Sequence, residues 1–289
     1  MAVYERNYKG YQGELTPHWA RFLVLPRTTF RMVFASKMFL LFFIASMLVP
    51  LVMAAWVYLS HNMQLVEKAF GIQLDGFAQV NADVFLAFMG IQIMPMGFVL
   101  VLLVAPQLVS ADLANNALPL YLARPFNRTD YILGKMSVLI ILLSAVTWVP
   151  HGLVFLLQSY FSGWQWFVDN IRIGIAIFIF SWVWILTSSL VALALSALLR
   201  TKRVIRLSLF AVYIILSGFG GFLYGALNIP FGLNLSLVIT QQRVAEGLFG
   251  TQAEISEVSL FSAWVSVIVF CAIAIYILFR KIRAYEEVK

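Results

Sequence analysis

Six long apolar runs divide the chain, and shorter polar or charged segments separate them. An α-helix needs about 20 mainly apolar residues to cross a hydrocarbon core roughly 30 Å thick. Each run meets that length, so the pattern predicts an all-α polytopic membrane protein with six transmembrane helices. Prolines inside a run do not exclude it, because neighbouring helices can satisfy the freed backbone groups. The predicted spans are residues 38–59, 84–109, 131–157, 171–199, 204–227 and 260–279.

The composition supports this class. Of the 289 residues, 62% are hydrophobic and only 11% are charged, whereas a soluble domain carries about 25% charged and about 45–50% apolar residues. A soluble fold of this length could not bury so much apolar surface. No Gly/Ser-rich or Pro-rich linker divides the chain, so we predict a single transmembrane domain over residues 1–289. The lone Cys271 excludes an intrachain disulfide.

Lys and Arg residues are distributed unevenly between the two sides of the predicted membrane. Seventeen of the 20 fall in the N-terminal segment 1–37, the segment 124–135, the turn 200–206 or the tail 280–289. The other side holds Lys68, Arg172 and Arg243. Cytoplasmic loops carry such an excess of cations. We therefore expect a multi-pass protein of the plasma (inner) membrane with both termini in the cytoplasm. This explains the net charge of +7 without a nucleic-acid partner.

The segment 17–36, just before the first span, has the pattern of a basic amphipathic helix. Its apolar residues are Trp19, Phe22, Leu23, Phe30, Val33 and Phe34, and its cations are Arg21, Arg27 and Arg31. A helix of this kind lies in the membrane interface, in contact with lipid. We expect Pro26 to break it in two. The segment has two interpretations, an elbow that docks on a partner protein and a simple orienting anchor.

Several kinds of chemistry have no signature in the sequence. The chain lacks the G-x-x-x-x-G-K-[ST] loop that cradles nucleotide phosphates and any close Cys/His cluster for a metal. We therefore predict no catalytic residue, no metal ligand and no cofactor in this chain. No ionisable residue stands out at mid-membrane, where ion-coupled transporters usually carry one. We expect His151, close to the outer end of the third span, to be hydrogen-bonded at the membrane interface; the alternative is that it lines a substrate path.

The polar segment 110–135, between the second and third spans, has an apolar stripe and a defined end. The stripe is formed by Leu118, Leu120, Tyr121 and Leu122, and Arg124-Pro125 ends it. A short amphipathic element of this kind fits a groove on a soluble partner. The alternative is a surface helix packed on its own bundle.

This segment resembles the six-helix permease subunits of type-two ATP-binding-cassette (ABC) exporters. That family has an acidic residue, a Leu-Leu pair, an Arg-Pro turn, a further Arg and a Gly-Lys pair at the third span. The sequence departs from the family pattern at Asn116-Ala117, where Gly-Thr is usual, and at Pro119. The resemblance implies a cytoplasmic coupling helix that contacts a separate ATPase subunit, which binds ATP and Mg. The residues implied in that contact are Asp112, Asn116, Leu118, Leu120, Tyr121, Leu122, Arg124, Pro125 and Arg128.

The resemblance also implies features outside the loop. In the family, a segment such as 228–259 carries short helices that dip toward the membrane and cap the exit, whereas an ordinary solvent loop is the alternative here. A permease of six spans works with a second copy of itself or with a similar subunit. Gly221-x-x-x-Gly225 has the small-residue spacing that allows close helix approach. We expect these two glycines to contact the second copy, with packing inside one chain as the alternative.

Three other functions are compatible with six spans. A channel or secondary transporter would work without an ATPase. A membrane enzyme would need convergent polar groups at one membrane depth. A membrane anchor would transmit ATP-driven motion to an extracytoplasmic protein partner. The permease interpretation predicts transport, with export as the direction that the resemblance implies and with no named cargo.

Overall fold

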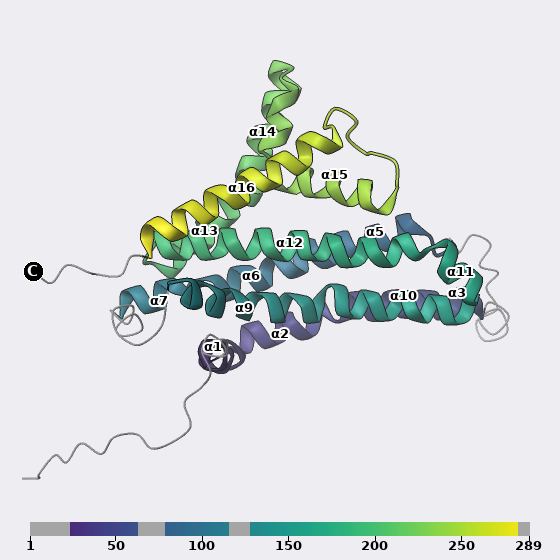
Figure 1. Ribbon diagram of the computed structural model, residues 1–289, viewed down its shortest axis with the longest axis horizontal. Coiled ribbons are helices and arrows are strands. Elements are labelled where there is room, and N and C mark those ends of the chain that lie inside the picture. The colour runs from purple at the N-terminus through teal and green to yellow at the C-terminus, as the bar shows by residue number, and fades with distance from the viewer. Residues whose placement is uncertain (1–23, 63–78, 116–127, 283–289) are drawn as a thin grey trace, which may run out of the picture.

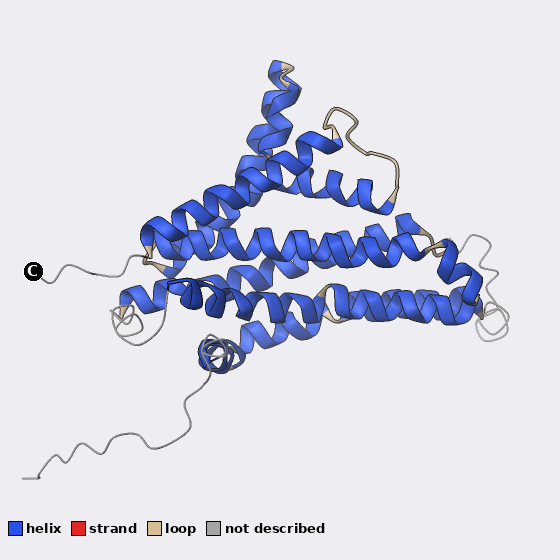
Figure 2. Ribbon diagram, viewed as in Figure 1, coloured by secondary structure: helices blue, strands red, loops and turns tan. Residues whose placement is uncertain are grey.

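The computed structural model describes residues 24–62, 79–115 and 128–282. All regular structure in these ranges is helical (Figure 2), with no strand among the described residues. The predicted all-α class is therefore confirmed for this part of the chain.

Six helical stretches within the described ranges are long and apolar enough to cross a membrane, as predicted (Figure 1). They are Lys37–His61, Ala82–Gln107, Thr129–Ser162, Ile171–Leu198, Lys202–Leu227 and Leu260–Lys281. The third extends five residues beyond its predicted end, because α10 continues to Ser162 before Gly163 (φ 90°) ends it.

Most spans are built from more than one helical piece. The first contains α2 (Lys37–Ser46) and α3 (Leu48–His61), and the second contains α5 (Ala82–Ile91), η2 (Gln92–Gly97), α6 (Phe98–Val104) and η3 (Ala105–Gln107). The third contains α9 (Arg128–Val146) and α10 (Trp148–Ser162), and the fourth is the single helix α12 (Ile171–Leu198). The fifth contains α13 (Lys202–Phe210), η4 (Ala211–Ile215) and α14 (Leu216–Leu227). The sixth is the single helix α16 (Leu260–Lys281). The remaining elements are α1 (Val24–Phe34), α7 (Val109–Ala114), α11 (Trp164–Asp169), η5 (Pro230–Leu235) and α15 (Leu237–Phe249).

Two of the interruptions lie at prolines. Met94, directly before Pro95, has φ −127° and ψ 110°, outside the helical region. A residue before proline is pushed toward extended backbone in this way. Thr147 (φ −107°, ψ −96°) separates α9 from α10 three residues before Pro150. His151 is fully buried there, and its Nδ1 lies 2.9 Å from the carbonyl oxygen of Thr147. Its predicted place at the membrane interface stays a prediction, and the span continues 11 residues beyond His151, to Ser162.

The fourth span, α12, forms the centre of the bundle. It packs against α9 and α10 on one side and against α15 and α16 on the other. Small buried residues let its neighbours approach closely. Gly97 of the second span lies against the Trp184 ring, which a Cβ at this position would meet at 2.5 Å. Ser188 and the Tyr213 hydroxyl are 2.8 Å apart, so α12 is tied to the fifth span as well.

The first described helix, α1, packs on α9. Leu25, Thr29 and Val33 are buried, whereas Arg27 and Arg31 are exposed. The predicted amphipathic helix is thus confirmed over Val24–Phe34, while residues 17–23 lie outside the described ranges. Pro26 lies in the first turn of α1, and because residues 17–23 lie outside the described ranges, the predicted break at Pro26 stays a prediction. Proline is tolerated in a first turn, because the N–H that it lacks would have no helical acceptor there.

Both α1 and the end of α16 lie at the left of the bundle in Figure 1, together with α7 and the start of α9. Most described cations lie at this end, which we call the basic end. They are Arg27, Arg31, Lys37, Arg128, Lys135, Arg200, Lys202, Arg203, Arg206, Arg280 and Lys281. At the opposite end, the described cations are Arg172 and Arg243. The charge asymmetry read from the sequence therefore persists in three dimensions.

Candidate functional site

At the basic end, Asp112 of α7 is bonded to two side chains of α9. Its Oδ2 lies 2.8 Å from Nζ of Lys135 and accepts a 2.6 Å hydrogen bond from the Tyr131 hydroxyl. Tyr131 and Lys135 are four residues apart, so α9 presents both on one face. The Lys135 side chain is only 3% exposed. A lysine this buried needs a paired carboxylate, because an unpaired charge in the interior is costly.

The start of α7 is anchored separately, by the fourth span. Oγ of Ser196 accepts hydrogen bonds from the backbone N–H groups of Val109 (3.1 Å) and Ser110 (2.9 Å). These N–H groups belong to the first turn of a helix, where no helical acceptor exists. The hydroxyl of Ser110 donates to the carbonyl of Pro106 at 3.0 Å. A side chain of α12 thus acts as the N-terminal cap of α7.

These contacts fix both ends of the segment that joins the second span to the third. Asp112 precedes residues 116–127, and Lys135 follows them. One polar cluster connects α7 to α12 through Ser196 and to α9 through the contacts of Asp112 with Lys135 and Tyr131. We call these four residues the loop clamp. A force applied to the segment between the clamped ends would therefore reach three helices directly.

The structure brings together only part of the predicted coupling surface. Asp112 lies in the loop clamp, and Arg128 begins α9 at the same end. The predicted contact residues Asn116, Leu118, Leu120, Tyr121, Leu122, Arg124 and Pro125 lie outside the described residues. Tyr131, Lys135 and Ser196 were not predicted as site residues. The spacing of Tyr131 and Lys135 was a visible signal, whereas nothing near Ser196 in the sequence indicates its role.

The two glycines predicted to contact a second copy lie on α14, which projects from the bundle in Figure 1. A Cβ added to Gly221 or Gly225 would meet no described atom within 4 Å. Gly220, by contrast, faces η5, where a Cβ would meet the carbonyl oxygen of Gly232. Packing within the chain therefore occupies Gly220, and the contact of Gly221 and Gly225 with a second copy stays a prediction.

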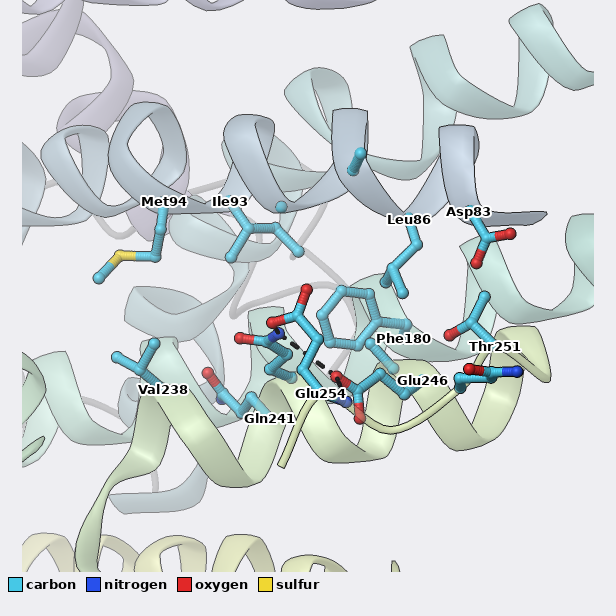
Figure 3. Close-up of a pocket in the computed structure, with 15 residues that line it drawn as sticks. Asp83, Leu86, Ile93, Met94, Phe180, Val238, Gln241, Glu246, Thr251 and Glu254 are labelled. Atoms are coloured by element: carbon cyan, nitrogen blue, oxygen red, sulfur yellow. Dashed lines mark hydrogen bonds between the residues drawn. The ribbon is translucent and has the colours of Figure 1, made fainter. Parts of the chain in front are cut away.

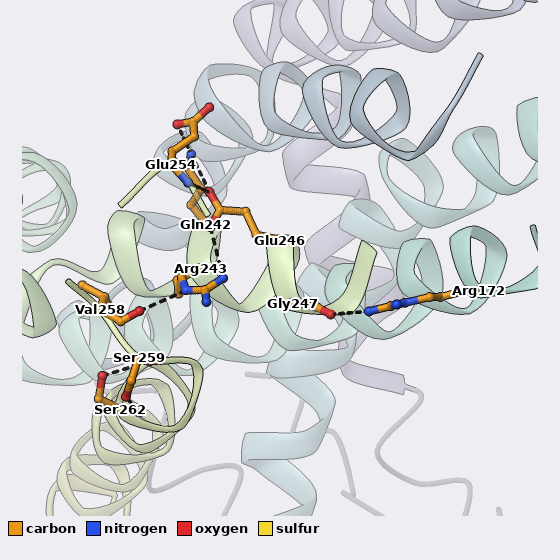
Figure 4. Close-up of polar contacts among 9 residues, drawn as sticks. All are labelled: Arg172, Gln242, Arg243, Glu246, Gly247, Glu254, Val258, Ser259 and Ser262. Atoms are coloured by element: carbon orange, nitrogen blue, oxygen red, sulfur yellow. Dashed lines mark hydrogen bonds and ion pairs between the residues drawn. The ribbon is translucent and has the colours of Figure 1, made fainter. Parts of the chain in front are cut away.

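The predicted short helices between the fifth and sixth spans are present as η5 and α15. This segment is packed rather than an ordinary solvent loop, since Leu237, Val244 and Phe249 of α15 are buried. Arg172, at the start of α12, donates to the carbonyl oxygens of Leu248 (2.9 Å) and Gly247 (2.8 Å; Figure 4). An arginine at the last carbonyls of a helix is favourable for both hydrogen bonding and charge.

The turn after α15 is held by a second polar network (Figure 4). Arg243 donates from Nε to the carbonyl oxygen of Val258 at 3.0 Å, and its Nη1 lies 3.5 Å from Oε2 of the buried Glu246. Gln242 donates to Glu254 at 2.5 Å and to Glu246 at 3.3 Å. The network ties residues 250–259 back onto α15.

Two further observations bear on function. Within the described ranges, no three His, Cys, Asp or Glu side chains come together as metal ligands would. Among known proteins, neither a family model nor a curated sequence matches this chain.

Proposed function

We propose that the chain is the membrane-spanning permease subunit of an ABC exporter. A separate ATPase subunit supplies the hydrolysis of ATP, and a second permease chain completes the translocation path. In this proposal the basic end faces the cytoplasm, so both termini are cytoplasmic. The proposal combines the six spans with the resemblance of the 112–135 segment to the exporter family.

The loop clamp is the observation that carries the proposal. A coupling element has to pass the motion of an ATPase to the spans without absorbing it. The short ion pair of Asp112 with Lys135 resists separation, because breaking it would leave a buried ammonium group without a partner. Ser196 adds a direct connection to the central helix α12. Force applied to residues 116–127 then acts on spans two, three and four together.

The charge distribution supports the orientation. Eleven described cations lie at the basic end and two at the opposite end, and the positive-inside rule assigns the cation-rich end to the cytoplasm. An ATPase that binds cytoplasmic ATP would meet the 116–127 segment at that face. ATP binding can shift the equilibrium between two permease conformations only to the extent that the ATPase subunit makes different contacts with each of them.

The experiment that tests the proposal is co-purification. The chain is expressed with its genomic neighbours, purified in detergent and assayed for a stoichiometric ATPase subunit. The double variant Leu120→Asp/Tyr121→Asp places charges in the apolar stripe and should release that subunit while the chain still inserts. Thr201→Asp is the matched control, since Thr201 is exposed at the same end, in the turn before α13, and should leave the complex intact.

The result can also go against the proposal. A chain that purifies without any ATPase and still moves a solute in liposomes is a channel or a secondary carrier. An ATPase that remains bound to the double variant would mean that the 116–127 stripe is not its docking site. A complex that hydrolyses ATP but moves no solute would point to the anchor function, with motion transmitted to an extracytoplasmic protein.

A further inference from the structure

A groove of about 340 Å³ lies between the ends of α12 and α16, at the basic end. The two helices pack along each other and end side by side at the left of Figure 1. Leu198 is the last residue of the fourth span, Lys281 is the last residue of the sixth, and both line the groove. The groove therefore lies where the apolar core of a membrane meets the lipid head groups. The proposed coupling to an ATPase does not use it.

The part of the groove that faces the membrane is apolar. Leu198, Ile277 and the ring of Tyr276 line it. Tyr276 and Ile277 come about one helical turn before Arg280, so they lie on the membrane side of the charged end of α16. Leu198 and Tyr276 are exposed, so the groove is open at the surface of the bundle. A hydrocarbon chain makes favourable contacts with such a surface.

The other part of the groove, at the helix ends, is cationic. Arg280 and Lys281 both line it, and Nη1 of Arg280 donates a 3.3 Å hydrogen bond to the Tyr276 hydroxyl. Four more exposed cations begin two residues after the end of α12, and they are Arg200, Lys202, Arg203 and Arg206. A cluster of about four to eight Lys and Arg residues next to the end of a span is typical of a site for anionic lipids.

No carboxylate balances these six cations within the described ranges. The ion pairs there join Lys135 to Asp112 and Arg243 to Glu246, and involve none of the six. The described carboxylates of the basic end are Asp112 and Asp130, on α7 and α9, and neither lines the groove. The tail 283–289 has two cations and two carboxylates, so it adds no net charge. The complementary anion therefore has to come from outside the chain.

We propose that this groove binds one anionic phospholipid from the membrane leaflet at the basic end. The phosphate accepts charge-assisted hydrogen bonds from Arg280 and Lys281, and one acyl chain packs on Leu198, Tyr276 and Ile277. A soluble anion would match the cations but would leave the apolar part of the groove without a partner, so a lipid fits better than a free phosphate. Binding requires neither an ATPase nor a second permease chain.

Binding is tested by native mass spectrometry of the delipidated full chain in detergent. The probe is dioleoylphosphatidylglycerol. Its neutral analogue, dioleoylglycerol, has the same two chains without the phosphate, and glycerol 3-phosphate is the anion without the chains. We expect the first phosphatidylglycerol to bind about tenfold more tightly than dioleoylglycerol, because it adds charge-assisted hydrogen bonds to the same apolar contacts. Glycerol 3-phosphate should not bind at concentrations that saturate the chain with phosphatidylglycerol.

Two variants assign the binding to the groove. Arg280→Gln/Lys281→Gln removes two charges but keeps polar side chains, and both residues are exposed, so the fold should hold. The affinity for phosphatidylglycerol should fall about tenfold, while the affinity for dioleoylglycerol stays. Leu198→Gln replaces an exposed apolar side chain of the groove by a polar one of similar size, and should weaken binding of both lipids about fivefold.

The controls are matched by residue type and charge. Arg27→Gln/Arg31→Gln removes the same charge from exposed arginines of α1, at the same end but outside the groove, and Leu153→Gln changes an exposed leucine of α10. Neither should alter binding of the first phosphatidylglycerol.

Three results would overturn the proposal. An equal loss of affinity in Arg27→Gln/Arg31→Gln would mean that the overall charge of the basic end, and not the groove, attracts the lipid. Equal affinity for phosphatidylglycerol and dioleoylglycerol would remove the role of the cations. Glycerol 3-phosphate that binds as tightly as phosphatidylglycerol would make the groove a site for a soluble anion. No ATPase takes part, so a failure here leaves the permease proposal standing, and the converse also holds.

Discussion

Lys135 and Asp112 are joined across the base of the segment that links the second and third spans, with Nζ 2.8 Å from Oδ2. One partner is on α7 and the other on α9, so the pair closes the segment into a loop with fixed ends. Both groups are largely withdrawn from solvent, at 3% and 13% side-chain exposure. A buried pair of this kind is a weak source of stability but a strong constraint on geometry.

Breaking the pair from one side should be costly. In Lys135→Met, Asp112 loses its counter-charge, and we expect unfolding to become easier by about 3 kcal/mol. Thermal unfolding in detergent measures this as a lower Tm. Lys281→Met, an exposed lysine at the same end of the bundle, should leave the Tm unchanged.

Removing both charges separates stability from coupling. The double variant Asp112→Leu/Lys135→Met leaves no buried charge, so it should recover most of the lost stability. If the pair serves coupling, the ATPase activity of the partner subunit should no longer change when this stable double variant is reconstituted with it. A double variant as unstable as Lys135→Met would contradict the assignment of the cost to the unpaired carboxylate.

The cap on α7 gives a second, independent prediction. Ser196→Ala removes the acceptor for two buried N–H groups, of Val109 and Ser110, and should destabilise the protein by about 1–3 kcal/mol. Ser189 lies on the same helix, is also fully buried, and its hydroxyl has no partner among the described residues. Ser189→Ala should therefore be neutral or stabilising, and the difference in Tm between the two variants measures the cap.

The spans could be predicted from the sequence because their signal is local. Length and hydropathy alone define a segment such as Ile171–Leu198. The breaks near Pro95 and Pro150 have a local cause, since proline disfavours a regular helix in the residues before it. Pro26 lies in the first turn of α1, where proline is tolerated, so its effect depends on whether another helix precedes it, and nothing local decides that.

Of the loop clamp, only Asp112 was predicted as a site residue. Lys135 and Tyr131 share one helix, and Asp112 precedes Tyr131 by 19 residues, so these three lie within one short stretch of the sequence. Ser196 caps a backbone group 86 residues away, and no pattern in a single sequence reports such a contact. The cavity of about 400 Å³ between α5, α12 and α15 (Figure 3) has the same origin, because its lining residues Asp83, Phe180 and Glu246 come from three segments that meet only in the fold.

The end of α15 depends on a left-handed glycine. Gly250 has φ +75°, and a Cβ there would meet the Arg172 guanidinium at 2.6 Å. Gly250→Ala combines backbone strain with displacement of Arg172, and we expect it to destabilise the protein by about 2 kcal/mol. Left-handed strain alone costs about 1 kcal/mol, so a loss no larger than that in Gly250→Ala would mean that Arg172 does not hold the end of α15. Gly163 has φ 90° and ψ 170°, a region essentially restricted to glycine, and Gly163→Ala should cost about 1–3 kcal/mol from strain although its Cβ has free space.

The free face of α14 predicts an effect on assembly without an effect on folding. A Cβ added at Gly221 or Gly225 meets no described atom within 4 Å, so substitution of either glycine by isoleucine should change the Tm little. If these glycines contact a second copy, Gly221→Ile and Gly225→Ile should convert a dimer to a monomer in light scattering of the detergent-solubilised protein. Gly152→Ile on α10 is the control and should stay dimeric. Dimers that persist in both α14 variants would exclude this face.

The proposed orientation is tested by labelling single cysteines in intact cells. Cys271 is first replaced by serine, which keeps a hydrogen bond to Thr187 possible at the 3.6 Å position of the thiol. Ser256 is exposed in the turn after α15, and Thr201 is exposed at the basic end. With the basic end in the cytoplasm, Ser256→Cys should react with an impermeant maleimide before lysis, and Thr201→Cys only afterwards. The reverse pattern would place the loop clamp outside the cell, where no ATPase could reach it, and would remove the structural basis of the permease proposal.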